Sequence, residues 1–444
     1  MTGFDQLGWT PAHGAIAFLA VLAAFAVTFF LVPRQARWMR ENGWVGRDVH
    51  KTALPEVPES GGLSPTVGMM AGMALLVAAV PALWRETVVL ALTVLAAAAI
   101  GWVDDRKRLS SLKKIVLVTL AGGPIFLANW VEFVDVGSPL IPVLGFTRMT
   151  VIYPLVLPLV IAVSTNTVNM LEGYNGEGAG TCTLVGASMV VAGLILNSAE
   201  AVVYGLVLCA ALLAFFWYNR YPARVFPGDV GTLATGAMIG GIGILGSIEV
   251  VMFCALLQHV FNSFYVLASL RGFRESHDVR VKDVWVDEND VIHASLDPAA
   301  PMTLPRLILA GGPLDEPGLV KHFLVLSGIS GIFGVVAAVA MQVTTGVVNV
   351  PLIVAVLVTA VVAFAALVWR FPRVRGVATI MILLLGGGLV LLMLVDGFIV
   401  DLGSLLNFVV SGVLGLAGAA AWYLLQRRYF FHKIRQYEAV AGGG

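Results

Sequence analysis

The chain is poor in charge. Only 12% of its 444 residues are Asp, Glu, Lys or Arg, whereas 59% are hydrophobic. Soluble globular proteins carry about 25% charged residues, so a water-soluble core of this composition is excluded. Acidic and basic residues number 27 each, and this balance gives no reason to expect nucleic acid as a partner. We therefore expect lipid to surround most of the chain.

Cysteine is also scarce, with 3 residues in the whole chain. Cys182, Cys209 and Cys254 each lie in an apolar run, and no two of them form a CxxC pair. Such cysteines are usually small buried hydrophobic residues, which argues against a disulfide framework or a cysteine metal site. The first apolar run lacks a basic flank and an A-x-A cleavage site, so we expect it to be retained as a membrane span.

What the chain does have is a long series of apolar runs. A helix of about 20 residues crosses the bilayer hydrocarbon, and lipid requires each spanning segment to satisfy its backbone internally. The sequence predicts about thirteen spanning helices, at residues 12–33, 63–83, 87–103, 113–130, 150–168, 178–196, 199–218, 232–248, 250–270, 319–343, 349–370, 376–396 and 403–425. The predicted fold is an all-α polytopic membrane protein.

Positive charges indicate how these spans are oriented. When the gaps between spans are numbered in order, every lysine and arginine except Arg85 and Arg148 falls in an odd-numbered gap or at its edges. Cytoplasmic loops are enriched in Lys and Arg, so the odd gaps are predicted to be cytoplasmic and the N-terminus to lie outside. The same gaps hold nearly all other polar residues, which favours an enzyme that takes a soluble substrate from one side.

An acid pair marks the end of the third predicted span. The segment GWVDDRKRLSSLKK places Asp104 and Asp105 where the chain leaves the lipid, and Lys113 and Lys114 follow one to two helical turns later. One alternative is that these side chains only reach from the span end to the polar interface. This explains the lysines well but the acids poorly, because acids at membrane depth are costly and usually functional. Adjacent carboxylates suit a divalent cation or general-base work, and a lysine suits a diphosphate.

Two further gaps carry amides and acids. In STNTVNMLEGYNGEGAG, Asn169 and Glu172 lie three positions apart on one helix face, and Asn175 follows among glycines. In NRYPARVFPGDVGTLATG, Gly228 and Asp229 directly precede a predicted span. Amide and carboxylate oxygens can complete a magnesium shell, and a helix N-terminus favours phosphate. Loop-capping asparagines and an N-cap aspartate are the alternatives that stay open here.

The first and ninth gaps complete the polar set. GRDVHKTALPEVPESGGLSP contains Lys51 and Glu59, and its prolines and glycines predict a structured loop. The gap after residue 270 contains Arg271, Arg274 and His277, and the alternation in VRVKDVWVDENDVIHASL predicts a small β-hairpin. Arginines near an acidic cleft suit a diphosphate, although positive-inside charge explains any one of them equally well.

Taken in order, these segments resemble the polyprenyl-phosphate N-acetylhexosamine-1-phosphate transferases. GRDVHKTALPEVPESGG, GWVDD with its later lysine, NTVNMLEGYNG, RVFPGDVGTL and the long loop after the ninth span occur in family order within about residues 30–330. None of the 7 histidines forms an H-x-H, whereas bacterial branches carry H-x-H-H in that loop. The chain is therefore most similar to the dolichyl-phosphate branch of archaea and eukaryotes, which uses UDP-N-acetylglucosamine. GYNGEGAG replaces the family's commoner GLNGLEAG, which leaves Glu177 without an assigned role.

The resemblance implies a fold, an activity and a cellular location. It implies a ten-helix catalytic core at residues 1–345, followed at residues 346–444 by about three additional C-terminal spans of unknown role. The implied reaction is magnesium-dependent transfer of N-acetylglucosamine-1-phosphate, or a related N-acetylhexosamine-1-phosphate, from its UDP-sugar to dolichyl or polyprenyl phosphate, with release of UMP. This is the first membrane step of lipid-linked oligosaccharide assembly for protein N-glycosylation. We expect the cell membrane of an archaeon, or the endoplasmic reticulum of a eukaryote, with the active site on the cytoplasmic side.

The resemblance also assigns roles to individual residues. Catalytic roles fall to Asp104, Asp105 and Lys114, and magnesium ligation to Asn169 and Asp229, with manganese as the alternative ion. Substrate-binding roles fall to Lys51, Glu59, Glu172, Asn175, Gly228, Arg271, Arg274 and His277. The expected partners are the UDP-sugar, the lipid phosphate and membrane lipid, and a homodimer is compatible with the sequence.

Two other classes of protein were weighed against this one. A secondary transporter would use Asp104, Asp105 and Asp229 as ion sites, and release of UMP from a UDP-sugar would separate it from a transferase. A CDP-alcohol phosphotransferase would carry a D-G-x-x-A-R run before paired aspartates, and the sequence contains no such run.

Overall fold

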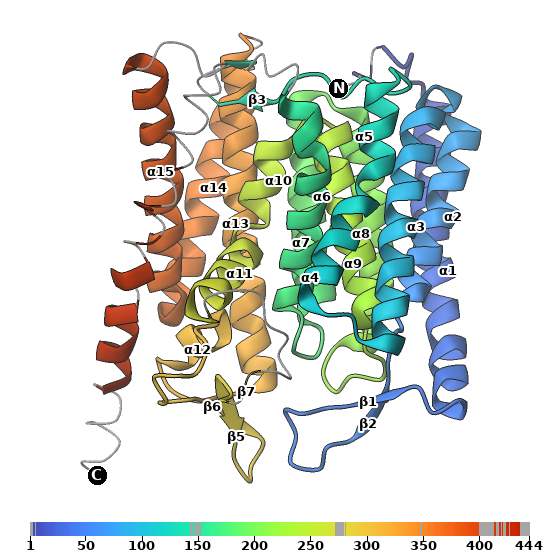
Figure 1. Ribbon diagram of the computed structural model, residues 1–444. Helices are drawn as coiled ribbons and strands as arrows, with labels where there is room; N and C mark the ends of the chain where they lie inside the picture. The colour runs from blue at the N-terminus through green and yellow to red at the C-terminus, as the bar shows by residue number, and fades with distance from the viewer. Residues whose placement is uncertain are drawn as a thin grey trace.

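The computed structural model describes residues 3–4, 6–142, 145–146, 152–270, 279, 281–346 and 349–398, and parts of 413–435, namely 413, 417–418, 420, 423–425 and 427–435. Most helices stand side by side in one upright bundle, with the N-terminus at one end and the C-terminus at the other (Figure 1). The helices are α1 (Pro11–Glu41), α2 (Leu63–Ala79), α3 (Trp84–Lys107), α4 (Ser111–Ala121), α5 (Gly123–Trp130), α6 (Ile152–Leu171), α7 (Glu177–Leu196), α8 (Ala199–Asn219), α9 (Gly228–Leu245), α10 (Glu249–Ala255), α11 (Leu257–Leu270), α12 (Leu304–Leu309), α13 (Glu316–Thr344), α14 (Val350–Arg370) and α15 (Arg375–Phe398), with short 3-10 turns η1 (Pro81–Leu83) and η2 (Pro372–Val374).

Among the described residues, 9 helical segments are long and apolar enough to cross a membrane, or 10 if a bent pair counts as one span. The predicted all-helical membrane architecture is thereby found, but the exact number of thirteen spans is not. The expected span at 250–270 is broken into α10 and α11, which meet at 67°. The expected span at 63–83 is the short helix α2 followed by η1. The span expected at 403–425 lies largely outside the described residues.

Short strands occupy the loops. In the first loop β1 (Val45–Arg47) pairs with β2 (Glu56–Pro58), so the predicted structured loop is confirmed. A second pair, β3 (Leu140–Ile141) with β4 (Gly145–Phe146), lies at the opposite end of the bundle (Figure 1). In the segment whose alternation predicted a hairpin, β5 (Val284–Val286) pairs with β6 (Val291–Ala294), and β7 (Leu314–Asp315) adds a third strand that the sequence did not predict.

Helix α9 forms the centre of the bundle. In its 18-residue apolar window 89% of the residues are buried, and it packs against α3 and α6 as well as α8. Glycine permits this close approach: a Cβ at Gly101 of α3 would collide with the backbone of Asp229, and a Cβ at Gly62 would collide with that of Gly231. Small residues bring helix backbones together inside a membrane, where packing replaces the hydrophobic effect between helices.

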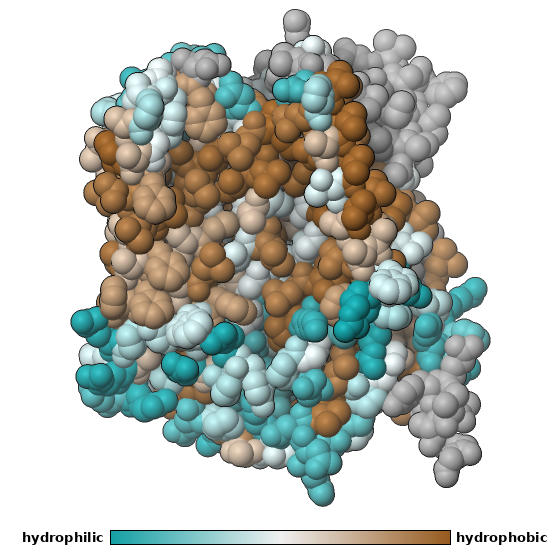
Figure 2. Space-filling view, turned by 180° about the vertical axis from the view of Figure 1, so that it is seen from behind, coloured by the Kyte–Doolittle hydropathy of each residue, from teal (hydrophilic) through white to brown (hydrophobic). Residues whose placement is uncertain are grey.

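The outer surface divides into an apolar belt and a polar end. Figure 2, which shows the molecule from behind, has a broad hydrophobic band across the helices. Hydrophilic residues gather at the end that carries β1, β2 and β5–β7. Large apolar side chains such as Phe18 and Leu120 are each 66% exposed, as expected for residues that face acyl chains. The protein is therefore a multi-pass membrane protein whose loops concentrate at one end.

Candidate active site

Four helix ends meet at the polar end of the bundle. Helix α3 ends just after Asp104 and Asp105, α4 begins just before Lys114, α6 ends just after Asn169, and α9 begins with Asp229 in its first turn. The α3 and α6 ends flank α9 because both helices pack along it. Residues more than 100 positions apart in the sequence are thus brought into one site, as the motif analysis predicted for this group.

Lys114 is the centre of this group. Its ammonium Nζ lies 2.7 Å from Oδ2 of Asp104 and 2.6 Å from Oδ2 of Asp229. The side chains of Lys114 and Asp104 are each 7% exposed, whereas that of Asp229 is 28% exposed. A buried lysine is stabilised by such paired carboxylates, because each ion compensates for water that the other has lost. Asp229 is the carboxylate of this group that solvent or a ligand reaches most directly.

Asp105 faces the start of α9 rather than Lys114. Its Oδ1 accepts a hydrogen bond from the backbone N–H of Asp229 at 2.7 Å, and its Oδ2 accepts one from Val230 at 3.5 Å. An acid at this place satisfies unpaired amides and the positive end of the helix dipole. The side chain of Asp229 makes no capping hydrogen bond at the start of α9, so the N-cap alternative for Asp229 is wrong. Asp105 accepts the hydrogen bonds of these first amides instead.

Asn169 holds the other oxygen of Asp229. Its Nδ2 donates to Asp229 Oδ1 at 2.6 Å and to Thr232 Oγ1 at 2.8 Å. Rotation of the side-chain amide would present its oxygen in place of the nitrogen. Carboxylate, amide and hydroxyl oxygens are the hard donors that magnesium prefers, so Asp229, Asn169 and Thr232 fit such an ion.

The first loop fixes where α9 begins. The backbone of Phe226 donates to Pro58 and accepts from Gly61, both at 2.8 Å, and Gly62 donates to Pro227 at 2.9 Å. Gly228 then turns the chain into α9 with a φ of +63°, a conformation that glycine adopts without strain. Glu59 precedes this contact at the edge of the site, where partial loss of water around its carboxyl and the nearby Asp105 raise its pKa.

A second polar cluster joins the first loop to α13. Lys51 Nζ lies 2.6 Å from Asp48 Oδ2 and 2.5 Å from Glu316 Oε2. The Asn175 amide donates to Asp48 at 3.0 Å, and its backbone N–H donates to Glu316 at 2.7 Å. Burial disfavours the charge of Lys51, yet these two carboxylates raise its pKa above the usual value. The predicted residues Lys51 and Asn175 therefore lie together, held by two acids.

The sequence analysis missed three members of this cluster. Asp48, His50 and Glu316 present ligand atoms within 4.8 Å of one another, a spacing that could hold a metal ion. The ammonium of Lys51 already lies between the two acids and opposes a second cation there. His50 stacks on Tyr174 with ring centroids 4.3 Å apart, and burial lowers its pKa. Proximity of Asp48 and His50 to Lys51 was the available signal, whereas nothing in the sequence marked Glu316.

Glu172 and Glu177 line the turn between α6 and α7. The Glu172 carboxylate packs against Gly178, where a Cβ would collide with it, and burial raises its pKa to about 8. It borders a cavity of about 20 Å³ that Thr232 also lines. Glu177 accepts hydrogen bonds from the backbone of Gly173 at 3.1 Å and Tyr174 at 3.2 Å. Glu177 therefore has a structural role in the loop.

Three of the predicted donor-binding residues, Arg271, Arg274 and His277, lie outside the described residues. In the sequence they stand between the end of α11 and the start of β5.

Comparison with known proteins supports the resemblance drawn from the motifs. Residues 87–247, which include Asp104, Lys114, Asn169 and Asp229, match the family model described as glycosyl transferase family 4. The candidate site of this polytopic membrane protein thus lies within the residues that match the family model.

The more particular resemblance rests on individual relatives. A protein of Sulfolobus acidocaldarius is 27% identical over 74% of this chain and 98% of its own length. One of Saccharolobus solfataricus is 28% identical over the same shares, 74% and 98%. Both bear the provisional name UDP-N-acetylglucosamine–dolichyl-phosphate N-acetylglucosaminephosphotransferase. A phospho-N-acetylmuramoyl-pentapeptide-transferase of Moorella thermoacetica is 35% identical over 28% of this chain and 38% of its own. These similarities agree with the predicted family resemblance and include proteins named for the dolichyl-phosphate branch.

Proposed function

We propose that this protein transfers N-acetylglucosamine-1-phosphate, or a related N-acetylhexosamine-1-phosphate, from its UDP-sugar to dolichyl or polyprenyl phosphate. The observation that carries the proposal is the placement of Lys114 between Asp104 and Asp229, beside Asn169, in a chain similar to enzymes so named. Release of UMP would make this the first membrane step in lipid-linked oligosaccharide assembly for N-glycosylation.

The reaction is a single phosphoryl transfer. An oxygen of the lipid phosphate forms a bond to the phosphorus that bears the sugar, and the bond from that phosphorus to the oxygen of UMP breaks. Negative charge moves onto the leaving phosphate, so catalysis depends on positioning and on cations aimed at phosphate oxygens. Lys114 supplies such a cation, because its ammonium is held at the helix ends by two carboxylates.

The two adjacent acids have different parts in this scheme. Asp105 is a positioning residue, since its carboxylate binds the first amides of α9 and so places Asp229. Asp104 shares Lys114 with Asp229 and also accepts from the backbone of Leu109 at 2.5 Å, which fixes the α3–α4 turn. Of the pair, Asp104 is the carboxylate that touches the catalytic lysine.

Magnesium fits the group around Asp229 better than the cluster around Lys51. Asp229, Asn169 and Thr232 offer oxygens, and Asp104, Asp105 and Asp229 outnumber Lys114, so the site attracts a cation. When bound, magnesium would neutralise charge on the diphosphate; manganese has similar ligand preferences. Asp229 and Asn169 would hold the ion, and Lys114 would turn toward substrate phosphate.

The donor would extend from this group toward Lys51. Asn175 and Lys51 offer amide and ammonium groups to a nucleotide, and Gly228 lets Ser60 and Asp105 approach the start of α9 closely. Glu59, Glu172, Arg271, Arg274 and His277 keep the substrate-binding roles that the family resemblance implies.

The surrounding membrane supplies the acceptor. The polar end would be cytoplasmic and the N-terminus outside, in an archaeal cell membrane or, for a eukaryote, in the endoplasmic reticulum. Residues 1–345 would form the catalytic core, either alone or as a homodimer, and 346–444 an additional membrane part. The match to the archaeal relatives spans 98% of their length but 74% of this chain, which supports a core shorter than the whole chain.

The test is release of UMP by the purified protein. UDP-N-acetylglucosamine and dolichyl phosphate together should yield UMP and lipid-linked sugar, with neither product formed when the lipid phosphate or magnesium is left out. Lys114→Ala should lower the rate about a hundredfold, because it removes a cation from the developing charge. The matched control is Lys113→Ala, at the exposed neighbouring position, which should leave the rate unchanged.

Two results would contradict the proposal. One is no UMP release with any UDP-N-acetylhexosamine; ion-coupled uptake in vesicles would then favour the transporter, for which broken helices such as α10–α11 are typical. The other is equal rates for Lys114→Ala and Lys113→Ala, which would remove Lys114 from the mechanism.

A further inference from the structure

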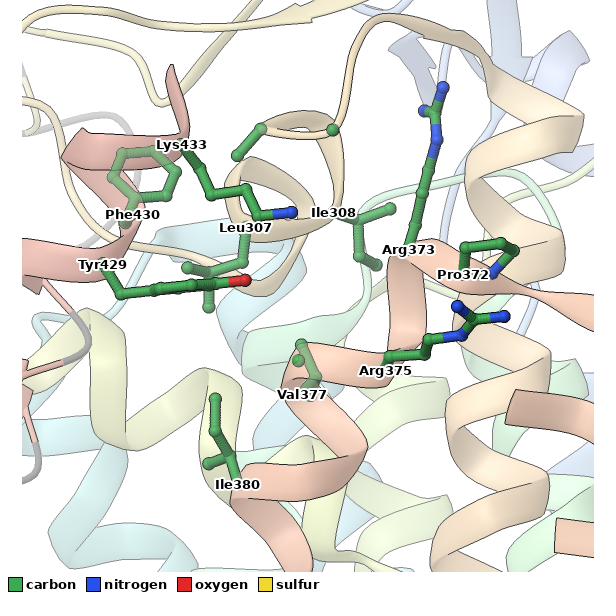
Figure 3. Close-up of a pocket in the computed structure, with 13 residues that line it drawn as sticks. Leu307, Ile308, Pro372, Arg373, Arg375, Val377, Ile380, Tyr429, Phe430 and Lys433 are labelled. Atoms are coloured by element: carbon green, nitrogen blue, oxygen red, sulfur yellow. The ribbon is translucent and has the colours of Figure 1, made fainter. Parts of the chain in front are cut away.

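A cavity separate from the catalytic group lies at the edge of the bundle. It has a volume of about 400 Å³ and is enclosed by α12, by η2 with the start of α15, and by the C-terminal helical residues 427–435 (Figure 3). None of its lining residues belongs to the groups around Lys114 or Lys51. Cavities of this size bind small molecules or head groups of larger ones.

Basic residues line the cavity without an acidic counterpart. Arg373, Arg375 and Lys433 contribute three positive charges, and the described lining contains no Asp or Glu. In Figure 3 the Lys433 ammonium and the Tyr429 hydroxyl point into the space between the elements. The Arg373 and Arg375 guanidinium groups extend away from that space along the rim of the cavity, so Lys433 is the cation inside it and the arginines add positive charge at its edge. Such surroundings attract an anion.

The arginines are held in place by the ends of neighbouring segments. Arg373 donates to the backbone oxygen of Gly312 at 2.9 Å, and Arg375 donates to those of Val368 at 2.9 Å and Trp369 at 3.1 Å. The last two carbonyls belong to the C-terminal turn of α14. The two guanidinium groups are therefore fixed at the rim of the cavity.

A buried arginine fixes the opposite wall. Arg306 is 0% exposed and donates to the backbone oxygens of Ser295, Asp297 and Ala300, at 2.7–3.0 Å. Its guanidinium lies 4.8 Å from the ring centroid of Phe430, which lines the cavity. This contact ties the C-terminal helical residues to α12, because a desolvated cation–π pair is stabilising.

The remaining wall is apolar and continues into a membrane-length helix. Ile308 of α12 and Val377 and Ile380 of α15 line the cavity. From Val377 to Val395 the sequence of α15 contains no charged residue, so acyl chains can lie along it. Basic residues next to an apolar wall fit a phosphate group that carries acyl chains. They fit free phosphate less well, because free phosphate has no apolar part to contact that wall.

We propose that this cavity binds the phosphate group of an anionic membrane lipid. Arginine and lysine at the cytoplasmic end of membrane helices recognise such head groups, and each basic residue strengthens the attraction. The lipid would brace α12, α14 and α15 against the C-terminal residues. It is not the acceptor, since the cavity shares no residue with the catalytic group, and the proposal stands whether or not the protein is a transferase.

The test is retention of lipid by the full-length protein in native mass spectrometry. Purified protein is mixed with phosphatidylglycerol or with zwitterionic phosphatidylcholine, and bound lipids are counted. Wild type should retain phosphatidylglycerol in preference to phosphatidylcholine. Lys433→Glu should lower that retention about tenfold, because it replaces attraction by repulsion. Arg428→Glu makes the same charge change in the same helical segment, at an exposed residue outside the lining, and should retain the lipid.

Three outcomes decide the proposal. Equal retention by Lys433→Glu and Arg428→Glu overturns the site. Thermal stabilisation of wild type, but not of Lys433→Glu, by inorganic phosphate alone, without lipid preference, assigns free phosphate and overturns the lipid. Retention that inorganic phosphate does not displace, and that falls in Lys433→Ala as well as Lys433→Glu, supports the lipid. The alanine variant keeps the test valid if the glutamate variant fails to fold.

Discussion

Helices α9 and α14 are both apolar and long enough to cross a membrane, but α9 is buried inside the protein and α14 lies mostly exposed on its surface. In α9 89% of the apolar window is buried, whereas in α14 the share is 11%. The mean hydropathy follows the reverse order, 1.3 for α9 and 2.8 for α14. The exposed helix α14 thus has the more hydrophobic sequence. The buried helix α9 is less hydrophobic, because it contains glycines and a carboxylate in its first turn.

This difference explains where polar chemistry can be placed. Asp229 tolerates its position because α3, α4 and α6 bring Asp105, Lys114 and Asn169 to it. Helix α14 packs on α13 and η2 and exposes most of its side chains. Its basic neighbours Arg373 and Arg375 lie just beyond its last turn. In these two helices a charge therefore lies either inside a network, as in α9, or at a helix end, as in α14.

The largest effect is expected at the buried end of α9. Asp229→Asn should lower UMP release about a thousandfold, since it removes the carboxylate that faces both Lys114 and the proposed magnesium. The rate is measured with UDP-N-acetylglucosamine and dolichyl phosphate. Asp135→Asn is the control, because Asp135 is exposed near β3 at the other end of the bundle. A rate for Asp229→Asn within tenfold of the control would rule out Asp229 as a metal ligand.

A smaller effect should separate the two helices in stability. Leu233 of α9 is 0% exposed, whereas Val361 of α14 is 67% exposed. Leu233→Ala should cost about 3 kcal/mol through a cavity in packed surroundings, whereas Val361→Ala should cost less than about 0.5 kcal/mol. Thermal unfolding in one detergent gives both values. Equal losses would contradict the assignment of α14 to a lipid-facing position.

The smallest effect concerns pH. Burial raises the pKa of Glu172 to about 8 from 4.5, so the folded protein holds a proton that the unfolded chain has lost. Stability should therefore fall as pH rises from 4.5 to about 8, and level off above that range. Glu172→Gln cannot ionise at this position, so its stability should not show this fall between pH 4.5 and about 8. The two melting curves should converge at acidic pH and separate toward pH 8; parallel curves would mean that the carboxyl is solvated.

The membrane class and the motifs could be predicted because they depend on local properties. A run of apolar residues forms a helix in lipid whatever its neighbours are, since the backbone has no other partner. Asp104, Lys114, Asn169 and Asp229 could be placed together because each stands at the end of its predicted helix that borders an odd-numbered gap. The break between α10 and α11 was missed, because 250–270 carries no proline, glycine or charged residue. The polar pair Gln258 and His259, directly after the break, was the available signal.

Sequence by itself determined that this protein spans a membrane, which of its residues carry charge, and which family its motifs resemble. Only the tertiary structure decided that Asp105 caps α9 while Asp104 pairs with Lys114, although the two acids are adjacent. Only the structure brought Glu316 to Lys51 from 265 positions away. The physical reason is that helix packing sets the direction of each side chain, and neighbouring positions on one helix point about 100° apart.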